Sequence, residues 1–184
     1  MAKWLAVVSF IVLLTISGLK LQQRSERLRY VPTGLGVDKI LYGNEDSIGL
    51  GPGASEAEFV MYELPTNVAE KIETNGIGFL GPMPEIADSN NVAHASYEDW
   101  QKTPILSDTK WADKGCNDQP ISASPATPKI VNFLCNYFDS SIDKSIEKEV
   151  DGVVSKPGSF YAYGRCGILI VSPEIRRVFY VHNG

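Results

Sequence analysis

The sequence has few of the residues that most often carry out chemistry. Its 184 residues include two histidines, His94 and His182, and three cysteines. No C-x-x-C or H-E-x-x-H pattern occurs, so no stretch of the chain has the spacing of a zinc site. The P-loop, kinase and G-x-S-x-G signatures are missing as well. We therefore expect neither a metal nor a cofactor, and the enzyme classes that these motifs identify are excluded.

The three cysteines, Cys116, Cys135 and Cys166, leave at least one thiol unpaired within a single chain. Cys135 falls on an apolar stripe and Cys166 borders an apolar run, so both are typical of small core residues. If the body lies outside the cytosol, a disulfide between Cys116 and Cys135 is an alternative. The sequence does not decide it, because it does not give the geometry that a disulfide needs.

The charge is divided unevenly along the chain. The formal net charge is −5, but residues 1–29 hold five basic side chains and one acidic one, a net of +4. Residues 30–184 hold 12 basic and 21 acidic side chains, a net of −9. Such an acidic body argues against binding of nucleic acid or anionic lipid through the overall surface field. The length of the body suits one domain.

An apolar segment begins the chain. Trp4–Leu19 is a run of 16 uncharged residues, and Leu21 extends it if the stem of Lys20 snorkels. A helix of that length spans roughly 24 Å, a little less than the ~30 Å of a hydrocarbon core. We expect an N-terminal transmembrane helix that contacts the membrane through residues 4–21, with residues 1–29 forming the anchor and its basic flank. A cleaved signal peptide is the alternative, although no A-x-A site follows the run.

The orientation of that segment is contested by two signals. Four basic residues follow the apolar run within ten positions. The positive-inside rule, applied to these residues, predicts that the body lies in the cytosol. If the short N-terminal tail stays in the cytosol, or if the segment is a cleaved signal, the body lies outside the cytosol. We expect this extracytoplasmic location, and the cytosolic orientation is left open. The stretch from Lys20 to Arg29 suits either contact with anionic headgroups or a solvated stop-transfer flank, and the flank is the favoured interpretation.

The sequence pattern of the body, residues 30–184, predicts an α+β fold in which a mostly antiparallel sheet packs against two helices. Alternating or continuous apolar residues predict strands at 37–42, 58–64, 77–80, 160–163, 166–171 and 177–182. Helical spacing and caps predict helices at 67–74 and 128–150. Residues 81–127 are irregular, with one helical turn at 96–99. This region is expected to be pinned to the core by four apolar residues rather than to form a binding loop, and the four are Trp100, Ile105, Leu106 and Trp111.

A glycine-rich segment, Gly49–Ala54, formally fits the G-x-G-x-x-A dinucleotide fingerprint. That fingerprint needs a helix to follow the loop, so that the helix N-terminus holds the phosphates. Here Pro52 and Gly53 interrupt the segment, and a strand is predicted after it. We therefore expect a plain glycine-rich turn and no nucleotide site.

Two sets of residues are candidates for a site. His94 and Cys116 share the irregular region and would form a nucleophile and base if folding brought them together, although an exposed loop histidine is the usual outcome. Tyr161, Tyr163 and Arg165 alternate along a strand, so they share one face and suit a recognition patch. The same alternation is typical of a sheet face covered by a helix, which is the favoured interpretation.

These observations predict a membrane-anchored, single-pass protein whose body is a non-enzymatic domain that binds a protein partner. A small hydrolase or transferase with its site in residues 81–127 is the alternative. Nucleic acid is not an expected partner, because the body is acidic.

Overall fold

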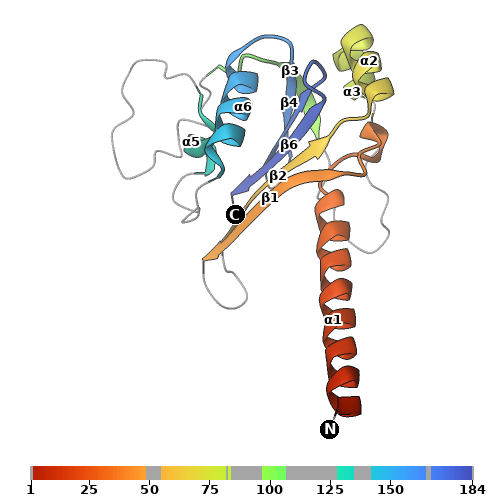
Figure 1. Cartoon of the computed structure of the whole chain (residues 1–184). Helices are drawn as coiled ribbons and strands as arrows, with labels where there is room; N and C mark the ends of the chain where they lie inside the picture. The colour runs from red at the N-terminus through yellow and green to blue at the C-terminus, as the bar shows by residue number, and fades with distance from the viewer. Residues whose placement is uncertain are drawn as a thin grey trace.

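The computed structural model describes residues 2–48, 55–81, 83, 97–106, 128–134, 142–164 and 167–183. Within these ranges, the side chains of residues 2, 3, 5–11, 13, 46–48, 55, 56 and 183 are outside the description. A long N-terminal helix leads into a twisted sheet with shorter helices on both of its faces (Figure 1).

The sheet has six strands in the order β1-β2-β6-β5-β4-β3, and all five pairings are antiparallel. The strands are β1 (Ile40–Ile48), β2 (Ser55–Glu63), β3 (Glu98–Lys102), β4 (Phe160–Tyr163), β5 (Gly167–Ser172) and β6 (Arg177–Asn183). The helices are α1 (Ala2–Leu28), α2 (Thr66–Asn75), α3 (Ile77–Leu80), α5 (Ile130–Leu134) and α6 (Lys144–Ser155), with a 3-10 turn, η1, at Thr33–Leu35. The predicted α+β fold with an antiparallel sheet is confirmed.

Alternation along the strands divides the core into two layers. On β2, Val60 and Tyr62 face one layer, which α2, α3 and the end of α1 cover. Phe59 and Met61 face the other layer, beneath α5 and α6. Because successive side chains on a strand point to opposite faces, the apolar run in β2 supplies both layers at once.

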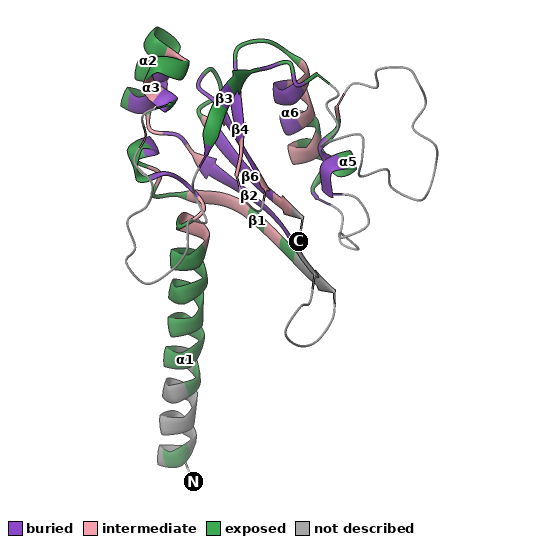
Figure 2. Ribbon diagram, turned by 180° about the vertical axis from the view of Figure 1, so that it is seen from behind, coloured by how far each residue is buried: buried purple, intermediate pink, exposed green. Residues whose placement is uncertain are grey.

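Helix α1 projects away from the sheet over most of its length (Figures 1 and 2). It starts at Ala2 and ends at Leu28, nine residues beyond the apolar run, so the predicted helix is confirmed. Its predicted transmembrane character is not supported. In the part of the chain that the structure describes, no helix combines the length and the apolar character needed to cross a membrane. From Lys20 onward the helix is mostly polar, with Leu21 and Leu28 as its apolar residues.

The single helix predicted for residues 128–150 is wrong. Helix α5 ends at Leu134 and α6 begins only at Lys144, with residues 135–141 outside the described part. Asp143 has an extended backbone and its carboxylate accepts from the backbone N–H of Ser145 at 2.8 Å, which makes it the N-cap of a new helix. The helix also extends beyond the predicted end at residue 150, because α6 continues to Ser155. The carboxylate of Asp151, inside α6, accepts from the backbone N–H of Ile130 at 2.8 Å.

Two short elements also differ from their predictions. Residues 77–80 form the short helix α3 rather than a strand, because Gly76 with its positive φ starts a new turn directly after α2. The helical turn expected at 96–99 is replaced by strand β3, which begins at Glu98. Trp100 and Ile105 are buried in the two core layers, so their predicted role in pinning this region to the core is confirmed. The same prediction is wrong for Leu106, which is 76% exposed, and Trp111 lies outside the described residues.

Candidate functional site

Most residues singled out from the sequence lie outside the described residues. His94, Cys116, Arg165 and the glycine-rich segment 49–54 all belong to this group, and so do Cys135 and Cys166. The proposed pairing of His94 with Cys116 is therefore untested. The region 81–127 is described at residues 81, 83 and 97–106.

The two tyrosines of the predicted recognition patch lie in the second core layer. Tyr161 is buried and its hydroxyl donates to Oε1 of Gln101 at 2.6 Å. Tyr163 is half-buried and meets Tyr161 edge to face, with ring centroids 5.8 Å apart. These contacts agree with the interpretation of this strand as a covered sheet face.

The charged side chains that the fold does bring together lie where the end of α1 meets β1, β2 and β6. We call Arg27, Tyr30, Glu45, Glu58 and His182 the helix joint. At its centre, the Arg27 Nε lies 2.7 Å from Oε1 of Glu58, and Nη2 lies 3.4 Å from Oε2 of Glu45. Arg27 and Glu58 expose 15% and 8% of their side chains, so this ion pair is largely removed from water.

Aromatic residues hold the backbone at the end of α1 and just beyond it. The Tyr62 hydroxyl donates to the carbonyl oxygen of Arg27 at 2.7 Å, and the Tyr97 hydroxyl donates to that of Tyr30 at 2.8 Å. The ring of Tyr30 stacks on Tyr180 with a centroid distance of 4.3 Å. The chain just beyond α1 is thus fastened to the sheet by two hydrogen bonds and a stacked ring pair.

Gly43 of β1 makes room for the Arg27 guanidinium. A Cβ at this position would lie 2.5 Å from Nη1 of Arg27 and 2.9 Å from its Cζ. Glycine inside a strand is unfavourable for the strand itself and commonly marks a close approach by another group. The close approach here is that of α1, so the sequence of β1 is adapted to the helix joint.

His182 is the histidine that the structure describes, and it belongs to the joint. It pairs across the strands with Glu58 and lies 6.4 Å from Tyr180 between ring centroids. A cavity of about 290 Å³ is lined by Gln23, Glu26, Arg27, Tyr30, Glu45, Glu58 and His182. His182 was not among the candidate site residues, although its alternation with Tyr180 on the last strand puts the two side chains on one face.

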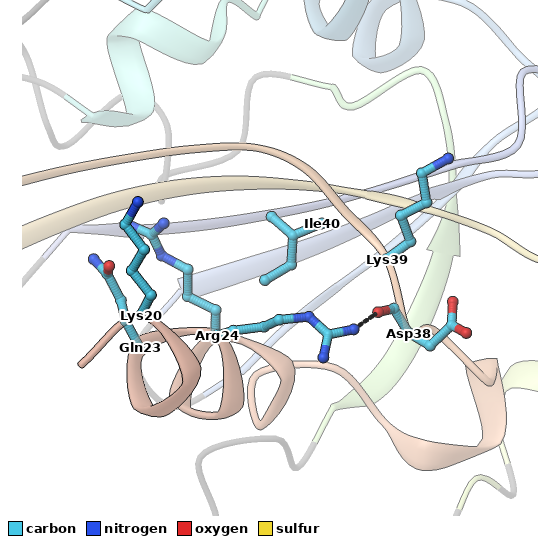
Figure 3. Close-up of a pocket in the computed structure, with 7 residues that line it drawn as sticks. Lys20, Gln23, Arg24, Asp38, Lys39 and Ile40 are labelled. Carbon is cyan, nitrogen blue, oxygen red and sulfur yellow. Dashed lines mark hydrogen bonds between the residues drawn. The ribbon is translucent and has the colours of Figure 1, made fainter. Parts of the chain in front are cut away.

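A second hollow lies on another side of the same helix. It has a volume of about 610 Å³ and is lined by Lys20, Gln23, Arg24, Arg27, Asp38, Lys39 and Ile40. Figure 3 shows the Arg24 side chain extending from α1 to the segment that leads into β1, where its guanidinium donates to the Asp38 carbonyl oxygen. We call Lys20, Arg24, Arg27 and Lys39 with this hollow the basic groove.

No protein-family model, curated protein or solved structure matches this chain. The chemistry of the joint therefore has to be derived from its own residues. Across the described residues, no group of three or more His, Cys, Asp and Glu side chains is arranged to hold a metal ion. The joint offers a buried ion pair, a neighbouring imidazole and a small polar cavity, which suit fixing the helix in place.

Burial raises the pKa of Glu58. Loss of hydration raises the pKa of Glu58 above its ordinary value of 4.5, an effect that outweighs the hydrogen bond and charge of Arg27, which lower the pKa. The exposed Glu63 behaves in the opposite way, because the hydrogen bond and charge of Lys39 lower its pKa. The two carboxyl groups lie on the same strand and therefore form a matched pair for a pH experiment.

We expect the stability contributed by Glu58 to fall as the pH rises. Below about 4.5 the carboxyl is protonated in both states. Above that pH the unfolded chain releases its proton first, so the native state binds more protons and the free energy of unfolding decreases until the raised pKa is passed. Urea titrations of the wild type and Glu58→Gln over this range should show a difference that shrinks with pH.

Glu63→Gln is the control for this experiment. Its lowered pKa reverses the sign, so the corresponding difference should grow as the pH rises through the pKa of Glu63 to its ordinary value. A Glu58 difference that grows with pH in the same way would contradict the assignment, because it would mean that Arg27 outweighs the loss of hydration.

Proposed function

We propose that the protein is attached to a membrane through residues 4–21 and that its body, residues 30–184, is a non-enzymatic domain that binds a protein partner there. The observation that carries the attachment is the apolar surface of α1. Ten large apolar side chains are exposed among the described residues, and six of them lie on this helix: Trp4, Val12, Leu14, Ile16, Leu19 and Leu21. Exposed apolar surface on such a scale favours contact with lipid or with another chain.

The distribution of these side chains around α1 favours lipid. Successive residues of a helix are about 100° apart, so Val12 and Leu14 point in nearly opposite directions. Leu19 and Leu21 repeat this separation, and both expose 66% of their surface. A partner helix covers one stripe, whereas lipid surrounds a helix on all sides. An apolar surface that continues around the helix is therefore better matched to a bilayer than to one neighbouring helix.

The helix joint supports the same function because it fixes the direction of α1. The Arg27–Glu58 ion pair and the stack of Tyr30 on Tyr180 connect the end of the helix to two strands of the sheet. A helix held in this way would set the height and tilt of the body above the membrane. The proposal puts the body on the extracytoplasmic side, and the cytosolic orientation that the basic residues after the apolar run favour is the alternative.

The partner surface that we propose is the outer edge of β1. In the described sheet this strand is at one end of the strand order and pairs only with β2 (Figure 1). A nine-residue edge strand offers backbone N–H and C=O groups to an added strand of another protein. The strand contacts the end of α1 through the Arg27–Glu45 ion pair, so a membrane-bound partner can reach it.

Site-specific photocrosslinking tests the partner. A benzophenone amino acid replaces Asn44 on β1 in the full chain, and the matched control replaces the exposed Lys148 on α6. We expect one discrete crosslinked product from position 44 in intact membranes and none at that mass from position 148. Identical product patterns from both positions, or no product from position 44, would contradict partner binding at this edge.

A further inference from the structure

The basic groove concentrates positive charge on a protein whose body is acidic. Four cationic side chains and one carboxylate, that of Asp38, line it. Two of the four cations have acidic partners, since Arg27 pairs with Glu58 and Glu45, and Lys39 pairs with Glu63 at 2.6 Å. No ion pair within the described residues includes Lys20 or Arg24. Their charges are thus not neutralised by the part of the fold that is described.

Arg24 is already held in position. Its guanidinium donates to the carbonyl oxygen of Asp38, an uncharged acceptor that orients the side chain and leaves its charge in place (Figure 3). A guanidinium has five N–H donors in a planar fork that matches two oxygens of a phosphate. The oriented Arg24 therefore has donors to spare for a phosphate group. Lys20, one helical turn earlier, extends from another part of the same groove and adds a second positive charge there (Figure 3).

The position of the groove along α1 identifies the source of that phosphate. Lys20 follows the apolar run directly, and Lys20 to Arg27 covers roughly 10 Å of helix axis. The headgroup layer on each side of a bilayer is about 5–8 Å thick. With Trp4–Leu19 in the hydrocarbon core and Lys20 at its boundary, the groove opens into the headgroup layer. We propose that it binds the phosphate of an anionic phospholipid, an inference that rests on the proposed membrane attachment.

Native mass spectrometry of the full chain in neutral detergent micelles tests this inference with phosphatidylglycerol, phosphatidylcholine and inorganic phosphate as probes. We expect phosphatidylglycerol to be retained in preference to phosphatidylcholine. The charge that Lys20→Gln/Arg24→Gln removes should weaken this retention by about 30-fold. Lys20→Gln alone should weaken it about fivefold, and because this lysine is exposed, its loss leaves the fold intact. The control variant, Lys144→Gln/Lys148→Gln on α6, removes the same charge elsewhere and should bind as the wild type does.

Equal retention of phosphatidylglycerol by the wild type and both groove variants would overturn the inference. Binding of inorganic phosphate that displaces the lipid would overturn it too, because the site would then serve a free anion. The micelle experiment does not require the chain to reside in a bilayer. If the chain washes out of membranes but retains phosphatidylglycerol in micelles, the proposed membrane attachment is contradicted. If the chain stays in membranes but does not retain phosphatidylglycerol in micelles, the proposed lipid site in the basic groove is contradicted.

Discussion

Replacing Arg27 with methionine is expected to lower the free energy of unfolding of the full chain by about 3 kcal/mol. The substitution removes the partner of the buried Glu58 at 2.7 Å and leaves a carboxylate in a site that water reaches poorly. Breaking one half of a buried ion pair is far more costly than removing both halves, because the remaining charge has lost its hydration and gained nothing. The hydrogen bond from Tyr62 to the backbone of residue 27 is kept, so the loss reports on the side chain.

Chemical denaturation followed by circular dichroism measures this loss, and a second variant shows its cause. Arg27→Met/Glu58→Met removes both charges and should recover at least half of the lost stability. Lys39→Met breaks the exposed ion pair with Glu63 in the same region and should unfold at nearly the denaturant concentration of the wild type. A loss below about 1 kcal/mol for Arg27→Met, or no recovery in the double variant, would mean that the joint does not hold the helix as described.

The strands at the end of the chain were the easiest part of the fold to predict. Ile168 to Val171 is continuously apolar, and the turn at residues 173–176 separates it from the equally apolar β6. Both strands are covered on two faces, so their sequences carry a strong and unbroken signal. The predicted bounds of β4, β5 and β6 differ from the observed ones by no more than one residue at either end.

Strand β1 was predicted at residues 37–42, but it runs from Ile40 to Ile48. Gly43 and Asn44 are typical turn residues, and they ended the predicted strand too early. The actual role of Gly43 is to accommodate the guanidinium of Arg27, 16 residues earlier in the chain. A requirement set by a distant side chain leaves no local pattern, so the full extent of the strand and the joint were missed together.

The joint as a whole was hidden for the same reason. Arg27 belongs to a basic flank, Glu58 begins an apolar strand and His182 ends another, and each has an ordinary local explanation. Only the antiparallel register of β2 and β6 places Glu58 beside His182, and only the end of α1 brings Arg27 to them. Long-range pairing of this kind is not encoded in periodicity.

The break between α5 and α6 shows a different limit. Leu134, Ile142 and Ile146 keep helical spacing, so the pattern favoured one continuous helix. Asp143 followed by Ser145 was the overlooked signal, because an aspartate that caps the N–H two residues later begins a helix. Here a local capping bond outweighs a periodic stripe that is compatible with either one helix or two.

Alkaline carbonate extraction of membranes that contain the full chain tests the proposed attachment most directly. We expect the wild type to remain in the membrane pellet and Leu14→Lys/Ile16→Lys to move to the supernatant. Two lysines in the middle of an inserted helix would cost about 6 kcal/mol, more than a single apolar helix of this length can offset. Leu106→Lys replaces a leucine that is 76% exposed outside α1, and this control variant should stay in the pellet.

The distribution between pellet and supernatant therefore decides the central claim. Retention of the wild type and of Leu106→Lys, together with release of Leu14→Lys/Ile16→Lys, is the result that attachment through residues 4–21 predicts. Release of the wild type by carbonate, or retention of all three proteins alike, would contradict it and would mean that the apolar surface of α1 is covered by something other than lipid.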